Sequence, residues 1–409
     1  MLRLLKRRVV LLLAGACSLS AAPSFYKDVA PILQQRCQSC HRAGEIGPMP
    51  LTTYRETRPW AKAIREAVAL KRMPPWFADS RFGDFANDPS LTAAEIATVT
   101  AWVAAGAPAG SVKDAPASAK WAAGRELSNA NVITAMVRPF RVAARMTIPY
   151  QSFVLPASFA ADTWASAVEI RPSDRTVVHH AVLYVREPGA SWLDKVPNTA
   201  DILAIYTPGA PVMKCPEGMA KKIPAGSDLV LQMHYTSKAT DAADKTEVAI
   251  VTSAAMPKYR MLTLQMARYD LDIPPGDREY RATVSGTMPQ DSLLVSMYPH
   301  MHLRGSGFEY QIVSGTGGRV ENLLKVNGYD FSWQLAYRLR QPRLLPAGTR
   351  LLFTGYFDNS AGNKRNPDPT AEVMWGEQSW EEMMVGVFQV IEPVDANSAP
   401  SNDASEKGN

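Results

Sequence analysis

The sequence predicts a multidomain protein in which a small all-α domain is followed by two all-β antiparallel sandwich domains. First, 409 residues are too many for one ordinary domain. Second, apolar residues recur at helical spacing from about residue 25 to residue 108. Third, the chain beyond residue 130 consists of short apolar or alternating runs between Pro, Gly, Asn and Asp, a pattern typical of antiparallel sandwiches. A hydrophobic fraction of 46% and a charged fraction of 20% fit folded cores of this kind.

Residues 1–22 have the pattern of a secretory signal peptide. Four basic residues within 1–8 precede the apolar run 9–16, and small residues continue to Ala22. This run is too short to span a bilayer unaided, so we expect a periplasmic or secreted protein with no transmembrane span beyond the signal. Cys17 leaves lipoprotein anchoring as a less favoured alternative. Loss of residues 1–22 removes four positive charges, so the formal charge of +5 falls to about +1 and no nucleic-acid partner is implied.

The helical region 23–108 contains one motif with a specific chemical meaning, Cys37-Gln38-Ser39-Cys40-His41. Two thiols one helical turn apart add to the vinyl groups of haem, and the following histidine supplies an axial imidazole. We therefore expect a small all-α cytochrome c domain that carries one covalent haem c on Cys37, Cys40 and His41. Cys17 leaves with the signal, so Cys215 has no disulfide partner in the mature chain and is expected to be a small buried hydrophobe.

The sixth haem ligand is expected to be a methionine. Met73 lies in Arg72-Met73-Pro74-Pro75-Trp76, an extended proline-fixed loop that can aim sulfur at iron, and Met49 is the competing candidate. Further along, Thr92-x-x-Glu95 is a capping box that opens the terminal helix of this region.

Residues 109–130 are rich in Ala, Pro, Gly and Ser, which indicates a linker. Five apolar or alternating runs beyond it predict strands, at residues 177–185, 229–235, 293–297, 351–357 and 385–391. The β region is longer than one sandwich needs, so we divide it into sandwiches at 131–256 and 257–395. Residues 396–409 lack large apolar side chains and are expected to be a disordered tail.

The five remaining histidines all fall within the β region and suggest two copper sites. Residues two apart on a strand point the same way, so His300 and His302 form a preformed pair. Adjacent His179 and His180 face opposite sides of a regular strand, so a shared metal requires a twist or ligation across the strand edge. His234 supplies a third nitrogen for that site, and a thioether would complete the other one in a form that favours Cu(I).

Four short motifs occur in the order found in copper type II, ascorbate-dependent monooxygenases, the family of peptidylglycine alpha-hydroxylating and dopamine beta-monooxygenases. They are Val178-His179-His180-Ala181, Leu231-Gln232-Met233-His234-Tyr235, His300-x-His302 and Glu382-Met383. The similarity spans roughly residues 132–393, and the whole chain resembles bacterial members with an N-terminal cytochrome c.

The resemblance implies a role for each ligand. His179, His180 and His234 would hold the copper that supplies electrons, and His300, His302 and Met383 would hold the copper where oxygen and substrate meet. Met384 is the neighbouring alternative to Met383. In this family the two metals face each other across an open, watery cleft without a bridging ligand. Peptide-processing members have an arginine where this chain has Tyr298, so a peptide C-terminus is not the expected substrate.

These observations predict an O2-dependent copper monooxygenase that hydroxylates a C–H bond of a small-molecule substrate. Its electrons would come from an ascorbate-like reductant or a redox protein and would pass through the haem. The alternative is a non-catalytic electron-transfer cytochrome c with copper-binding β-sandwich domains. A third interpretation keeps only the haem region functional and treats the sandwiches as a scaffold.

Overall fold

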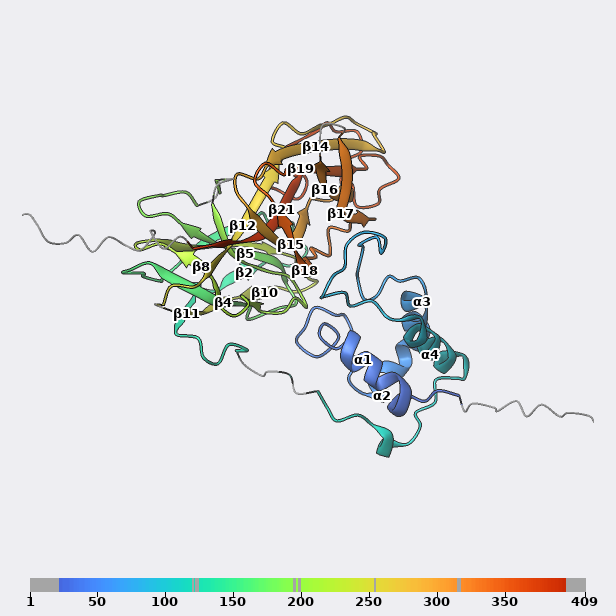
Figure 1. The fold of residues 1–409 in the computed structure, drawn as a ribbon. Helices are drawn as coiled ribbons and strands as arrows, with labels where there is room; N and C mark the ends of the chain where they lie inside the picture. The colour runs from blue at the N-terminus through green and yellow to red at the C-terminus, as the bar shows by residue number, and fades with distance from the viewer. Residues whose placement is uncertain are drawn as a thin grey trace, which may run out of the picture.

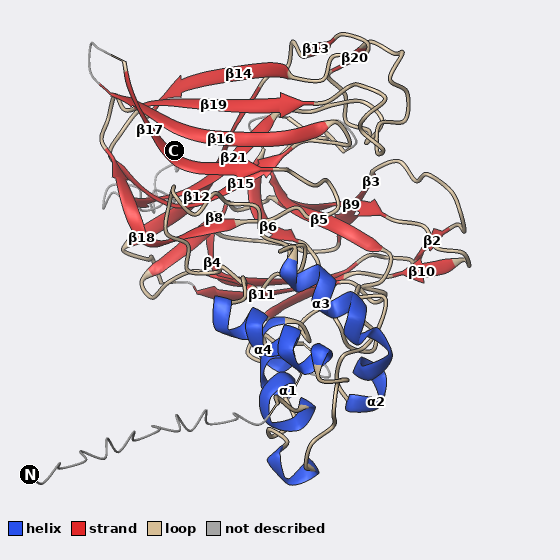
Figure 2. Ribbon diagram, turned by 90° about the vertical axis from the view of Figure 1, so that its right-hand side faces the viewer, coloured by secondary structure: helices blue, strands red, loops and turns tan. Residues whose placement is uncertain are grey.

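The computed structural model describes residues 22–394, except 120, 122–124, 194–195, 198–199, 254 and 315–317. The expected tail and, apart from residue 22, the expected signal peptide lie outside these residues. Strands make up 39% of the structure and helices 12%, so the fold is mainly β. The helices gather at one end of the β body (Figure 2). None of the helices in the described part of the chain is long and apolar enough to cross a membrane.

Short helices and long loops form the N-terminal region. The elements are η1 (Phe25–Val29, a π-helix), α1 (Ala30–Arg36), α2 (Tyr54–Thr57), η2 (Arg58–Trp60), α3 (Ala61–Ala69), α4 (Ala93–Ala104) and η3 (Val112–Asp114). The predicted capping box is confirmed, because the Thr92 side chain accepts from the Glu95 backbone and the Glu95 side chain accepts from the Thr92 backbone. Phe25, Leu33 and Trp102 pack together in the small apolar cluster that these helices enclose.

The expectation of an all-α cytochrome c domain is wrong. The α-helices are only 4 to 12 residues long, and loops fill residues 37–53 and 70–92. Prolines and glycines interrupt the helical pattern in these loops. The second loop instead packs on the β body: Ala78 bridges Val326, Phe85 bridges Leu339, and Phe85 is buried in the large C-terminal core. The helical region therefore buries part of its apolar surface, such as Phe85, in the C-terminal core of the β body.

The β body contains all the strands of the described residues. Their bounds are β1 (Val132–Ala135), β2 (Phe140–Val142), β3 (Gln151–Leu155), β4 (Thr163–Arg171), β5 (Val178–Arg186), β6 (Asp201–Tyr206), β7 (Met213–Lys214), β8 (Met219–Ile223), β9 (Asp228–Tyr235), β10 (Ala242–Asp244), β11 (Glu247–Ser253), β12 (Tyr259–Ala267), β13 (Asp272–Ile273), β14 (Tyr280–Thr287), β15 (Ser292–His300), β16 (Gly305–Ser314), β17 (Arg319–Asn327), β18 (Tyr337–Leu345), β19 (Arg350–Phe357), β20 (Val373–Met374) and β21 (Val385–Pro393). All five runs predicted as strands form strands, as β5, β9, β15, β19 and β21.

One nine-stranded sheet runs through both halves of the β body, in the order β1-β11-β4-β8-β12-β21-β15-β18 with β7 beside β4. The sheet β3-β9-β5-β6 packs on its first half, and the sheet β14-β19-β16-β17 packs on its second half. Figure 1 shows β12 and β21 near the middle of the body, with β8 to their left. The expectation of two separate antiparallel sandwiches is thus wrong, because β8 and β12 pair in parallel and join the halves.

Candidate metal centre

The five histidines of the β body meet where its two halves face each other. His179 and His180 lie at the start of β5, His234 lies near the end of β9, and His300 ends β15. His180 is paired directly with His234, and the register of β5 against β9 shifts between Val178 and His180. This bulge leaves His179 outside the ladder. A bulge re-aims side chains, which explains how two adjacent histidines reach one site.

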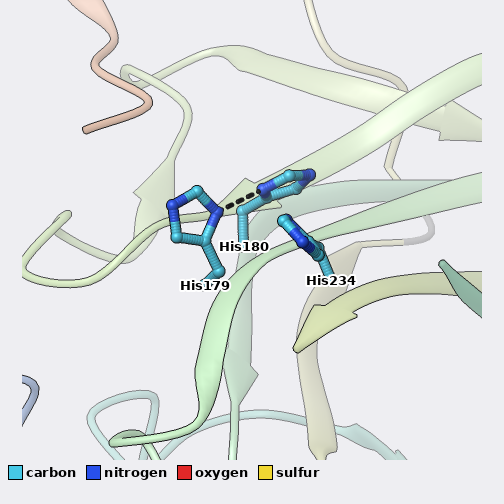
Figure 3. A group of neighbouring side chains, drawn as sticks. All are labelled: His179, His180 and His234. Atoms are coloured by element: carbon cyan, nitrogen blue, oxygen red, sulfur yellow. Dashed lines mark hydrogen bonds between the residues drawn. The ribbon is translucent and has the colours of Figure 1, made fainter. Parts of the chain in front are cut away.

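His179, His180 and His234 form a compact nitrogen cluster. One ring nitrogen from each lies within 4.8 Å of the others, and Figure 3 shows the three imidazoles converging. The Nδ1 atoms of His179 and His180 are 3.1 Å apart, so at most one of them carries a hydrogen. This spacing is short enough for one ion to bind all three rings.

His300 and His302 complete a single cluster with these three residues. Their ring centroids lie 5.2 Å apart, and the ring of His300 lies 5.9 Å from that of His180. Phe331 stacks on His179 at 5.0 Å and lies 5.8 Å from His302, so one aromatic ring touches both groups. The two groups therefore do not face each other across the open cleft that the resemblance implied.

Burial lowers the pKa values of all five imidazoles, which favours their neutral form. It lowers the pKa of His179 to about 4, with a further contribution from His300. Burial, followed by neighbouring imidazoles, holds the pKa values of His180, His234 and His302 well below the usual range, and burial also lowers the pKa of His300. The neutral ring is the form that binds a metal, because its second nitrogen keeps a free lone pair.

Two residues from the second half orient the pair His300 and His302. The Nδ1 atom of His300 lies 3.0 Å from the Oε1 atom of Gln334, which fixes the ring so that Nε2 is available. The carboxylate of Glu382 accepts backbone N–H bonds from His302, Arg304 and Met383 at 2.6 to 3.1 Å. Burial raises the pKa of Glu382 to about 7. This carboxylate ties the loop after β15 to the segment that carries Met383.

The expected sulfur ligand faces the junction of the two halves. Met383 is half-buried and packs against a cluster that includes Tyr298, Val385 and Val182. Met384 is fully buried in the C-terminal core, against the backbone of Gly355. Adjacent residues of an extended segment point to opposite sides, so Met384 serves packing, and the role of Met383 as a ligand stays a prediction.

Unpartnered polar atoms in the cluster test whether it fits a metal. The Nδ1 atom of His234, the Nε2 atom of His302 and the hydroxyl of Tyr150 are buried with no hydrogen-bond partner in the described part of the chain. Buried polar atoms without partners cost free energy, so such atoms in a native site call for a ligand. Imidazole nitrogens fit copper better than they fit Mg²⁺ or Ca²⁺. The residues present therefore fit copper.

The loop of the Cys37-x-x-Cys40-His41 motif also has a geometry suited to its expected cofactor. The Nδ1 atom of His41 lies 3.1 Å from the carbonyl oxygen of Met49, which leaves Nε2 for a metal. A side chain at Gly47 would lie 2.8 Å from that imidazole, so only glycine permits the turn. Burial raises the pKa of Cys37 to about 12 and also raises the pKa of Cys40. The Nε2 atom of His41 is therefore free for a metal, and haem attachment stays a prediction. Met73 as the sixth ligand of the haem iron, with Met49 as the alternative, stays a prediction.

Three residues of the centre were not predicted from the sequence. Tyr150 places its ring 4.7 Å from His234 and 5.5 Å from His180, Phe331 joins the two histidine groups, and Gln334 orients His300. None of the three belongs to a short motif with the histidines, so the spacing of residues along the sequence does not mark them.

The comparisons with known proteins add little to this geometry. No family model matches the chain, and no curated protein matches it. Among solved structures, the major capsid protein P2 of bacteriophage PM2 is similar with a TM-score of 0.30 and 11% identity, over 65% of this chain and 98% of that chain. The STIV MCP has a TM-score of 0.29 and 8% identity over 66% and 98%. PNGase F has a TM-score of 0.26 and 8% identity over 64% and 94%. Similarities this weak carry no argument about function.

Proposed function

We propose that this protein is a copper- and haem-containing oxidoreductase that uses O2 to hydroxylate a C–H bond of a small molecule. The five histidines and Met383 would hold two copper ions, and Cys37, Cys40 and His41 would carry one haem c. The observation that carries the proposal is the single cluster of five imidazoles, of which those of His180, His234 and His302 are buried and two have an unpartnered ring nitrogen. A core histidine that serves packing alone would have both nitrogens satisfied.

The chain's own residues supply orientation and exclusion of water. Copper bound at the cluster would supply the one-electron steps and the activation of O2. Gln334 and Glu382 fix the ring of His300 and the backbone of His302, which limits the positions that a ligand can take. Phe331 and Tyr150 cover the rings and keep the surroundings apolar. Met383 offers a soft sulfur, which favours the reduced metal.

The overall reaction needs electrons from outside the substrate. A C–H bond, one O2, two electrons and two protons yield a C–OH group and one water. An ascorbate-like reductant or a redox protein would supply the electrons, and the haem would relay them. The export pattern at residues 1–22 suits this chemistry, because haem c proteins and their donors are found outside the cytoplasmic membrane.

A non-catalytic electron carrier is the second candidate. The observation that favours it is the closed arrangement of the rings, with the ring centroids of His180 and His300 only 5.9 Å apart and His180, His234 and His302 buried. Such a cluster transfers electrons without admitting a substrate. Substrate-stimulated O2 uptake separates the two functions, because only the monooxygenase couples O2 consumption to a hydroxylated product.

The proposed function is tested by O2 uptake in the copper- and haem-loaded protein with candidate substrates. We expect Met383→Ala to abolish substrate-stimulated uptake. The control is Met213→Ala, which removes a half-buried methionine near Cys215 and leaves the histidines untouched. Normal turnover in Met383→Ala would contradict the assigned catalytic site. Reduction of the metals without substrate-stimulated uptake would favour the electron carrier.

A further inference from the structure

The loop of the CxxCH motif lies against the strand that neighbours the histidine cluster. A side chain at Gly209 would come within 2.4 Å of the Sγ atom of Cys40, so the backbone after β6 nearly touches that sulfur. Ser39, Glu45, Tyr206 and Gly209 line one cavity of about 220 Å³ between the loop and the β body. The two parts of the chain are therefore docked at the cysteine that would carry the haem edge.

Charged groups hold this docking contact. Arg175, three residues before β5 begins at Val178, places Nη1 2.9 Å from Oε1 of Glu45, and Arg42 binds the same carboxylate at 2.6 Å. The Glu45 side chain is 10% exposed and that of Arg175 is 30% exposed, so water screens this pair only in part. The pair fixes the CxxCH loop to the segment that leads into the histidines.

Tyr206 connects the docked loop to the cluster. It is the last residue of β6, and it lies close enough to Cys40, Glu45 and Arg175 for each to influence its hydroxyl. In the ladder of β5 and β6 it pairs with Ala181, which is covalently joined to His180. Tyr206 thus lines the cavity beside the CxxCH loop, and its backbone pairs with the residue that follows His180.

We infer that electrons enter the histidine cluster from the CxxCH loop through Tyr206, across a docking contact held by Glu45 and Arg175. This inference rests on the proposed function, because it needs haem on Cys40 and copper on His180. With both groups bound, one electron would pass from ferrous haem iron to cupric copper, with no bond formed or broken. Tyr206 is a positioning residue, since it lines the cavity between the CxxCH loop and β6 and is itself neither oxidised nor deprotonated.

Flash reduction of the haem in the loaded protein, with the copper oxidised, tests this route. The absorbance of the haem then reports its reoxidation without any substrate or turnover. We expect a first-order rate independent of protein concentration. Tyr206→Leu should slow it, and Tyr206→Phe, which keeps the ring, should restore it. Equal rates in Tyr206→Leu and the unsubstituted protein, with unchanged haem and copper content, would overturn the route through Tyr206.

Docking is tested separately by Arg175→Gln. Loss of a charge-assisted hydrogen bond should weaken the contact roughly tenfold, slow the reoxidation and lower the hydrogen-exchange protection of residues 206–213. The control is Arg186→Gln, which breaks the ion pair with Asp228 at the other end of β5. Unchanged protection and rate in Arg175→Gln would overturn the docking contact. Failure of the unsubstituted protein to reoxidise its haem would instead overturn the proposed function and the route with it.

Discussion

Replacement of Gln334 by leucine should weaken copper binding without removing a ligand. Gln334 is 2% exposed and its Oε1 atom lies 3.0 Å from the Nδ1 atom of His300. Loss of a partner that orients a metal-bound histidine reduces affinity about 10- to 100-fold, which corresponds to about 1.4 to 2.7 kcal/mol. The Nε2 atom of Gln334 also donates to the carbonyl of Phe331, so the apoprotein loses stability as well.

The assay is a competitive Cu(I) titration against a chromophoric chelator under anaerobic conditions. The matched control is Gln389→Leu, because Gln389 is hydrogen-bonded to Ser296 and Thr263 within the shared sheet and touches no histidine. It should lower the free energy of unfolding by a similar amount and leave copper affinity unchanged. Equal copper affinities in Gln334→Leu and the unsubstituted protein would refute the role assigned to Gln334.

Three further substitutions test the packing around the site. Phe85→Ala should lower the free energy of unfolding by about 3 kcal/mol in chemical denaturation, because Phe85 is 6% exposed in the C-terminal core; a near-zero change would show that the loop is not packed there. Asp244→Asn should cost about 3 kcal/mol in the same assay, since this fully buried carboxylate accepts from Ser173, Tyr235 and Thr246, and retained stability would count against that network. Tyr150→Phe should stabilise the metal-free protein by about 1 kcal/mol in thermal unfolding, because it removes an unpartnered buried hydroxyl; destabilisation would mean that the hydroxyl has a partner.

Local patterns predicted five of the strands well. Alternation placed β9 and β15 within a residue of their observed starts, because a half-buried strand has a two-residue period wherever it lies in the fold. The sequence also raised the difficulty that adjacent His179 and His180 pose on a regular strand. The bulge in β5 resolves it, and a bulge has no reliable signal in a single sequence.

Long-range pairing explains what the sequence could not predict. The parallel pairing of β8 with β12 joins Met219 to Tyr259 across a long stretch of chain, and this contact merges the expected sandwiches into one sheet. Similarly, the ring centroids of Trp76 and Tyr337 lie 4.7 Å apart. Both rings pack in a core that forms only when the C-terminal strands are in place. Neither contact depends on the local periodicity from which domains and helices were predicted.

The copper content of the purified protein after equilibrium dialysis tests the central claim most directly. We expect about two copper ions per chain in the unsubstituted protein and about one in His234→Ala. His179, His180 and His234 would hold one ion, and His300, His302 and Met383 would hold the other. A chain that retains no copper, or that retains the same amount after His234→Ala, would contradict the assignment of the five histidines as a metal centre.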